Sequence, residues 1–188
     1  MDVNNDFEII DGTLIKYKGN DKIVNIPDCV ETIGKDAFCS CDTLIQVVIG
    51  DNVKYIESSA FSGCFNLSNV TIGKSVRSIG RWAFCFCSSL QSIRISVGTI
   101  GCWAFSDCEN LTHVTFCDGV ITIGEYAFCG CEKLSSIDIA DSVESIRRDA
   151  FCECKSLSRV TITRHQNERA PSYLRNYFRR HNCEIEVK

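Results

Sequence analysis

Residues 120–139 read VITIGEYAFCGCEKLSSIDI, and the chain repeats this pattern around the dipeptide Ala-Phe. Written under one another, the copies share V-x-x-I-x-x-x-A-F-x-x-C-x-x-L-x-x-V-x-I. The dipeptide occurs six times, 21 or 23 residues apart, beginning at Ala37, Ala60, Ala83, Ala104, Ala127 and Ala150. Self-similarity at a period of roughly 20–50 residues indicates a solenoid, in which each repeat buries its apolar face against its neighbours.

The end of each repeat, L-x-x-V-x-I, alternates apolar and polar residues, which is typical of a strand. Because so short a repeat must turn back, its strand should lie about 4.8 Å from the previous one in a parallel sheet. The segment I-x-x-x-A-F-x-x-C should return along the opposite side as a short strand plus a helical turn. The Phe column, which runs from Phe38 to Phe151, should then fill the space between the two sides.

The repeats resemble the BspA-like leucine-rich repeats, whose hallmark is A-F-x-x-C-x-x-L followed by V-x-I. The resemblance covers nearly the whole chain. It implies an α/β repeat fold, a leucine-rich-repeat solenoid with one parallel sheet of about eight rungs, and parallel crossovers favour a right-handed one. That family often has proline after V-x-I, whereas here only the first strand does, as Ile26-Pro27. For function, the resemblance implies a range from surface adhesins to proteins of unknown role.

Both ends of the array are expected to be capped, because an open solenoid end exposes core and strand edge. Residues 7–18 predict a hairpin, FEII and TLIKYK, with Asp11-Gly12 as its turn. At the other end we expect a helix over 171–181 and a strand over 183–187. The chain then forms one domain, divided into an N-terminal cap, six repeats and a C-terminal cap over 1–29, 30–163 and 164–188.

The composition limits the kinds of partner. The chain has 188 residues, a net charge of -4, and 23% charged residues. This gives no reason to expect nucleic acid or an anionic membrane, and the arginines at 164, 169, 175, 179 and 180 are interpreted as the solvated side of the capping helix. No apolar run approaches the roughly 20 residues that span a bilayer. The polar N-terminus does not resemble a signal peptide, so the chain as written looks cytoplasmic; it would be surface-exposed if a leader had been removed.

Cysteine is unusually frequent, with 14 residues. One cysteine per repeat occupies the hallmark position, and we call these the inner cysteines: Cys41, Cys64, Cys87, Cys108, Cys131 and Cys154. Four others, the outer cysteines, precede this position by two residues: Cys39, Cys85, Cys129 and Cys152. We expect most of them to be reduced thiols in the core.

Disulfides and zinc are the alternatives for these cysteines. Two C-x-C pairs on neighbouring repeats could supply four thiolates to zinc, for example Cys129, Cys131, Cys152 and Cys154. Residues two apart on a helical turn diverge, however, and Ser62 and Ser106 interrupt the outer column. Stacked cysteines are also expected to lack the dihedral angle that a disulfide needs.

Nothing in the sequence predicts an enzyme, and we expect no cofactor and no metal. None of the three histidines lies in a metal-ligand or nucleophile motif. The recurring Ile-Gly is interpreted as a turn of the repeat, not as a phosphate-binding loop. A protein partner is therefore the expected ligand, with a weak homodimer as a further option.

The concave sheet face is the first candidate binding surface. The residues that alternate with the inward apolar ones point outward and form regular polar columns. A simply solvated sheet face is the alternative, because Ser and Thr suit exposed strands. The candidate residues are Gln46, Asn69, Thr71, Ser92, Arg94, His113, Thr115, Asp138 and Arg159.

Aromatic residues on the convex side form the second candidate surface. Three consecutive repeats carry a large aromatic just before Ala-Phe, and another lies four residues after the first of them. Such a patch would suit a partner or a second copy of the chain, whereas a half-buried ladder that stiffens the array is the alternative. The patch comprises Trp82, Phe86, Trp103 and Tyr126. Together the two surfaces predict a non-catalytic protein-binding or scaffold module, or else a structural, adhesin-like display protein.

Overall fold

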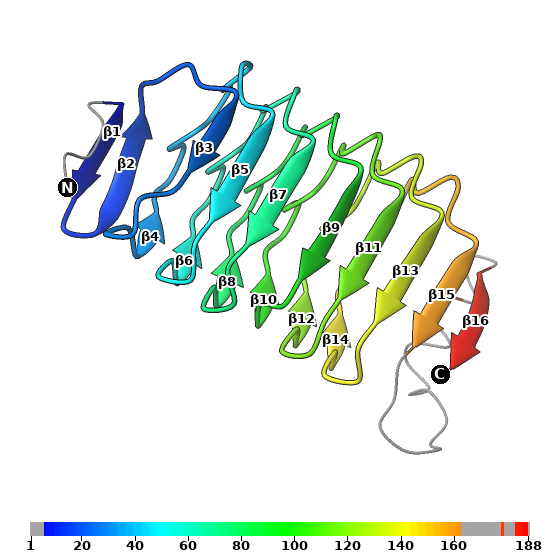
Figure 1. Ribbon diagram of the computed structural model, residues 1–188. Coiled ribbons are helices and arrows are strands. Elements are labelled where there is room, and N and C mark those ends of the chain that lie inside the picture. Colours follow the sequence, from blue (N-terminus) through cyan, green and yellow to red (C-terminus); the bar gives the residue numbers. More distant parts are fainter. Residues whose placement is uncertain (1–5, 163–177, 179–182, 188) are drawn as a thin grey trace.

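The computed structural model describes residues 6–162, residue 178 and residues 183–187. Each repeat forms one turn of a β solenoid and contributes one longer and one shorter strand, so that two walls of strands run along the array (Figure 1). Within a wall, equivalent residues of successive repeats pair directly, as Val47 does with Val70 and Ile33 with Ile56. The repeat pattern therefore predicts both the stacking and its register.

The V-x-I segments form the long-strand wall, in which the described strands pair in parallel. Its strands are β3 (Ile23–Asn25), β5 (Gln46–Ile49), β7 (Asn69–Ile72), β9 (Ser92–Ile95), β11 (His113–Phe116), β13 (Ser136–Ile139), β15 (Arg159–Ile162) and β16 (Glu184–Val187).

The opposite side is a second sheet, the short-strand wall. It begins with β1 (Phe7–Ile10), which pairs antiparallel with β2 (Thr13–Tyr17). The rest of the wall is parallel and consists of two-residue strands: β4 (Thr32–Ile33), β6 (Tyr55–Ile56), β8 (Ser78–Ile79), β10 (Thr99–Ile100), β12 (Thr122–Ile123) and β14 (Ser145–Ile146).

Two expectations for the fold were wrong. The short strands expected on the opposite side pair into a second sheet, so the protein does not have one sheet only. It is also a β solenoid rather than an α/β repeat, since Phe178 is the one residue in helix among those described. The helical turn expected around Ala-Phe does not form because the flanking residues adopt positive φ. In the fourth repeat these are Trp103 and Asp107, with φ of 60° and 57°. Right-handed helix cannot pass through such residues.

The core is a stack of phenylalanine rings between the walls. Phe84 is fully buried, and its ring centroid lies 5.0 Å from that of Phe61 and 5.1 Å from that of Phe105, with the rings nearly parallel. The preceding alanine is also fully buried, and its carbonyl accepts a hydrogen bond from the Phe amide of the previous repeat, as in Phe61 N–H to Ala83 O (2.7 Å). A larger side chain than alanine would separate the turns here, which explains the invariant Ala-Phe of the repeats.

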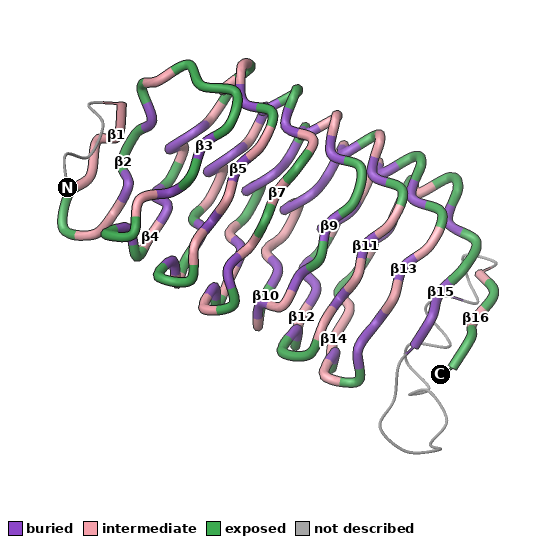
Figure 2. The backbone as a smooth tube through the Cα atoms, viewed as in Figure 1, coloured by how far each residue is buried: buried purple, intermediate pink, exposed green. Residues whose placement is uncertain are grey.

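The inner cysteines also have a structural role. The thiol of Cys64 donates a hydrogen bond to the Phe38 carbonyl at 3.1 Å, and Cys87 donates to the Phe61 carbonyl at 3.3 Å. The same bond joins Cys131 to Phe105. Cysteine is therefore both a small apolar residue and a donor to a buried carbonyl, which an alanine could not be. Figure 2 shows the buried residues along the interior of the array.

The long-strand wall has a seam between β7 and β9, where the strand ladder is interrupted. Val70 and Ile72 of β7 are half-buried, although the equivalent Ile93 and Ile95 are buried. The repeat that contains β9 is two residues shorter than the others, and the missing residues fall in the turn after Ile95. The interruption thus falls beside the strand that precedes the shortened turn, and this strand pairs with β11 but not with β7.

The N-terminal hairpin is confirmed. Asp11 and Gly12 have φ of 45° and 73°, the left-handed values that a two-residue hairpin turn requires. Tyr17 of β2 stacks on Phe38 at 4.9 Å and so continues the phenylalanine column into the cap.

At the C-terminal end, β16 pairs in parallel with β15, as expected for the last strand. Phe178 is buried and lies 5.9 Å from Phe151, ring to ring. The helix expected over 171–181 lies outside the described residues except for Phe178, so a helix–strand cap is not supported.

Candidate functional site

Side chains from two outward columns of the long-strand wall contact His113. Its Nδ1 lies 2.9 Å from the Ser136 hydroxyl, and its Nε2 lies 3.0 Å from the Asp138 carboxylate and 3.2 Å from the Thr115 hydroxyl. Strands β11 and β13 place these groups together because His113 pairs with Ser136 and Thr115 pairs with Asp138. The structure thus brings together three of the candidate residues and Ser136, which belongs to the same predicted outward column as His113.

Serine, histidine and aspartate side chains joined by hydrogen bonds are the residue types of a nucleophilic catalytic triad. Acyl transfer also requires amide donors directed at the developing oxyanion. Here β11 and β13 are each paired on both sides, so their amides are used in the sheet. The side chains of His113 and Asp138 are about two-fifths exposed, at 40% and 38%, which leaves them open to water. The arrangement is better suited to binding than to catalysis.

The other predicted concave residues lie along the same wall without joining this cluster. Arg94 is exposed and donates to the Cys117 sulfur at 3.2 Å, and Asn69 donates to the Ser68 hydroxyl at 3.0 Å. The remaining candidates are exposed or half-buried and have no side-chain hydrogen bond among the described residues: Gln46, Thr71, Ser92 and Arg159.

A groove of about 850 Å³ runs beside these columns, where each repeat turns into its long strand. Amide and hydroxyl groups line most of it, and lysine or aspartate occurs only in the outermost repeats. The lining residues are Asn20, Lys22, Asp42, Thr43, Ile45, Asn66, Ser68, Ser89, Gln91, Asn110, Thr112 and Lys133. A volume of this size is typical of ligand sites, but the lining is too polar for an apolar small molecule.

Several backbone carbonyls of the groove already accept hydrogen bonds from side chains. Asn66 donates to the Asp42 carbonyl at 2.7 Å, Asn110 donates to the Ser88 carbonyl at 2.7 Å, and Thr112 donates to the Gln91 carbonyl at 3.0 Å. By contrast, the side chains of Gln91 and Ser89 have no partner among the described residues. The groove therefore presents side-chain donors and acceptors to a ligand.

The groove was not expected from the sequence. The predicted binding surface lies one residue further along each strand, at Gln46, Asn69 and Ser92. The turn residues before them form the groove because they stack at the corner between the walls. Aligning the repeats does reveal the recurring amide or hydroxyl at these positions, which was the available signal.

The predicted aromatic patch is only partly assembled. Trp103 and Tyr126 stack face to face at 4.3 Å and are half-buried. Trp82 and Phe86 are more open, with 38% and 49% of their surface exposed. The Arg81 guanidinium lies 3.7 Å from the centroid of the Trp82 ring and covers part of it.

All four aromatics of this patch have left-handed backbone. Trp82, Phe86, Trp103 and Tyr126 have φ between 57° and 60°. Bulky side chains rarely adopt this conformation, which costs about 1–2 kcal/mol per residue. The equivalent positions of other repeats hold Asp, Ser, Glu or Gly. Aromatic residues are thus placed here at a conformational cost.

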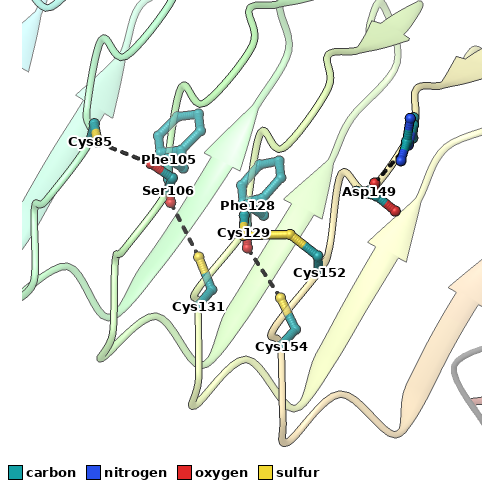
Figure 3. The surroundings of a disulfide bond; sticks show 10 residues. Cys85, Phe105, Ser106, Phe128, Cys129, Cys131, Asp149, Cys152 and Cys154 are labelled. Atoms are coloured by element: carbon teal, nitrogen blue, oxygen red, sulfur yellow. Dashed lines mark hydrogen bonds and ion pairs between the residues drawn. A yellow bond between two sulfur atoms is a disulfide. The ribbon is translucent and has the colours of Figure 1, made fainter.

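The outer cysteines contain one disulfide, between Cys129 and Cys152, whose Cα atoms are 4.6 Å apart (Figure 3). The expectation that stacked cysteines cannot bridge was therefore wrong for this pair. Equivalent residues of adjacent turns lie close enough, and the side chains rotate toward each other. The other 12 cysteines form no disulfide in the described structure, as expected for most of them. In the described part of the chain, no group of three or more His, Cys, Asp or Glu side chains could hold a metal ion.

The stacked turns, the parallel strands and the repeated L-x-x-V-x-I define a leucine-rich-repeat solenoid. The profile described as "BspA type Leucine rich repeat region" matches residues 9–98 and 93–176, with six copies. The chain belongs to this family, and the resemblance inferred from the sequence is confirmed.

Solved structures of bacterial proteins share this fold. A leucine-rich-repeat protein of T. pallidum is 26% identical, with a TM-score of 0.71, over 93% of this chain and 89% of that one. A leucine-rich cell surface protein of Faecalibacterium prausnitzii is 33% identical, with a TM-score of 0.63, over 80% of this chain and 50% of that one.

A pneumococcal vaccine antigen, PcpA, has a TM-score of 0.74 at 15% identity and shares the fold alone; the match covers 100% of this chain and 49% of that one. This chain thus spans about half the length of the F. prausnitzii and pneumococcal chains. A comparison with curated proteins gave no match. Within the described residues, no helix is both long and apolar enough to cross a bilayer.

Proposed function

We propose that this protein is a non-catalytic protein-binding module whose contact surface is the long-strand wall together with the adjoining groove. The observation that carries the proposal is the register of the wall. Parallel pairing repeats the same outward positions from turn to turn, and it assembles His113, Ser136 and Asp138 into one polar cluster. Repeat proteins commonly bind partners on such extended surfaces.

The charges on this surface suit a partner of mixed polarity. Arg94 pairs in register with Thr115, and Arg159 pairs in register with Ser136, so both exposed arginines lie beside the His113 cluster. Asp138 supplies the opposite charge. Because the groove is uncharged over its central repeats, polyanions such as nucleic acid are disfavoured there. We propose a reducing compartment such as the cytoplasm, because 12 of the 14 cysteines form no disulfide in the described structure.

A display scaffold is the second candidate function. The F. prausnitzii structure is that of a cell surface protein, and it is 33% identical to this chain over the region they share. In that case the chain would be one segment of an adhesin-like surface protein, and its role would depend on the elongated array. Cell fractionation of the natural host, with an antibody against this chain, distinguishes a cytoplasmic binding module from a cell-surface scaffold.

A capture experiment tests the binding surface. A wall variant, Arg94→Ala with His113→Ala, should retain the fold but lose a protein that the wild type captures from lysate of the source cell. The matched control, Thr99→Ala with Thr122→Ala, alters outward residues of the short-strand wall. Equal capture by the wild type and both variants would contradict the proposal.

A further inference from the structure

The outer cysteines differ from the inner ones in how they meet across the turns. The inner position is cysteine in all six repeats, whereas the outer position alternates between cysteine and serine before ending in two cysteines. In chain order the outer position holds Cys39, Ser62, Cys85, Ser106, Cys129 and Cys152. Only the last two turns therefore place two outer cysteines side by side, and there the structure has a disulfide (Figure 3).

The inner cysteines stack on every turn but are poorly placed to react. Cys64, Cys87, Cys108 and Cys131 are fully buried, and their thiols donate to phenylalanine carbonyls. Cys41 and Cys154 are half-buried, but the adjacent inner cysteine, Cys64 or Cys131, is buried. Burial raises the pKa of the Cys64 thiol to about 12 and that of Cys131 well above its ordinary value. Thiol–disulfide exchange needs an accessible thiolate, so these residues stay reduced.

Among the cysteines of the repeats, one adjacent pair has both members accessible to solvent. Cys129 and Cys152 are both half-buried, and their Cα atoms are 4.6 Å apart. Cys85 has no adjacent cysteine and instead lies 2.9 Å from the Ser106 hydroxyl. Cys39 is half-buried, but its neighbour on the next turn is Ser62.

We propose that Cys129 and Cys152 form a redox modification site, a reversible staple between the last two repeats. The oxidant is a small disulfide such as oxidised glutathione. The thiolate of one cysteine attacks a sulfur of this disulfide, forms a mixed disulfide and releases one reduced thiol. The other cysteine then attacks the protein-bound sulfur and releases the second thiol. Overall, two protein thiols become one disulfide, and one oxidised glutathione becomes two reduced molecules.

The staple links the turn of the fifth repeat to that of the sixth. In a solenoid each turn is held mainly by its neighbours, so a terminal turn can separate without unfolding the whole array. A covalent bond between residues 23 apart opposes this separation. Oxidation thus holds β14 and β15 in place, and reduction frees them to open more often.

Peptide mapping tests the selectivity of the site. Reduced protein is treated with oxidised glutathione, alkylated and digested without reduction. We expect one disulfide, Cys129–Cys152, which dithiothreitol removes. Ser62→Cys lies between Cys39 and Cys85, and it should gain a second reversible disulfide with Cys39, because Cys39 is half-buried whereas Cys85 is buried. Disulfides among the inner cysteines, or glutathione retained on Cys129 in wild type without the pair forming, would overturn the proposal.

Hydrogen exchange tests the consequence. Amides of β14 and β15 should exchange roughly a hundredfold more slowly in the oxidised protein than in the reduced one, as expected for a loop of this length. Cys129→Ser should exchange like the reduced protein under both conditions, and Cys85→Ser should respond like the wild type. Circular dichroism checks that each variant remains folded. Equal exchange in oxidised and reduced wild type would show that the bond does not act as a staple.

Discussion

At the scale of single residues, stability depends on positions that repeat along the column. Phe84 is fully buried between two stacked rings, whereas Gln46 on the long-strand wall is half-exposed. Phe84→Ala should lower the free energy of unfolding by about 3–5 kcal/mol, because the emptied site cannot collapse. Gln46→Ala should change it by less than about 0.5 kcal/mol. Urea unfolding compares the two, and equal losses would refute the inward and outward assignment.

Because the inner thiols are buried, we expect the free energy of unfolding to fall at alkaline pH. The folded-state pKa of Cys64 is raised to about 12 by burial, from an ordinary value near 9. Below pH 9 this thiol is protonated in both states, so its stabilising effect is fully present. Between pH 9 and pH 12 only the unfolded state ionises, and stability should fall by about 1.4 kcal/mol per pH unit for such a thiol.

The control for this prediction is Cys64→Ser, which keeps a donor for the Phe38 carbonyl but does not ionise in this range. Urea unfolding between pH 8 and pH 11 should show a shallower decline for the variant than for the wild type. Identical slopes would mean that the Cys64 thiol is not held protonated in the folded state.

At the scale of elements, the seam between β7 and β9 is the weakest part of the long-strand wall. Strand β9 pairs with β11 but not with β7, and the residues of β7 that should be buried are half-exposed. We therefore expect amides of β9 to exchange with solvent faster than those of β13, which is paired on both sides. Hydrogen exchange with peptide-level detection measures this. Equal protection of β9 and β13 would contradict an open seam.

The elements also show how far sequence reasoning reaches. Alternating apolar residues predicted the long strands, and Asp11-Gly12 predicted the hairpin, because each depends on local chemistry. A short strand was expected opposite each long one, but its pairing with its neighbours into a second sheet was not, because a two-residue strand is too short to show alternation. The turns around Ala-Phe were taken as helical because positive φ at residues such as Trp82 has no compositional signal.

The candidate site depends on contacts between repeats, which single motifs do not reveal. His113 and Ser136 are 23 residues apart and meet only because the repeats stack in register. The same spacing joins Cys129 to Cys152. Both pairs are visible once the repeats are aligned, but the side-chain rotations that bring the atoms together come from the packing. For the same reason the groove residues could be listed from the sequence but not recognised as a groove.

At the scale of the whole molecule, the exposed aromatics raise the question of self-association. Trp82 and Phe86 keep 38% and 49% of their surface exposed. Covering them removes apolar surface from water, so we expect a weak homodimer at high concentration. Trp82→Ser with Trp103→Ser should reduce association without unfolding the array, as measured by sedimentation equilibrium. A wild type that stays monomeric, with its tryptophans shielded from a polar quencher, would show that these rings serve packing alone.

The central claim, that the long-strand wall is the binding surface, is tested most directly by a hydrogen-exchange footprint of the captured partner. The account predicts slower exchange in β9, β11 and β13 and in the turns that line the groove when the partner is bound. Exchange in the short-strand wall should be unchanged. Protection confined to the aromatic patch, Trp82, Phe86, Trp103 and Tyr126, with no change in the long-strand wall, would contradict the account.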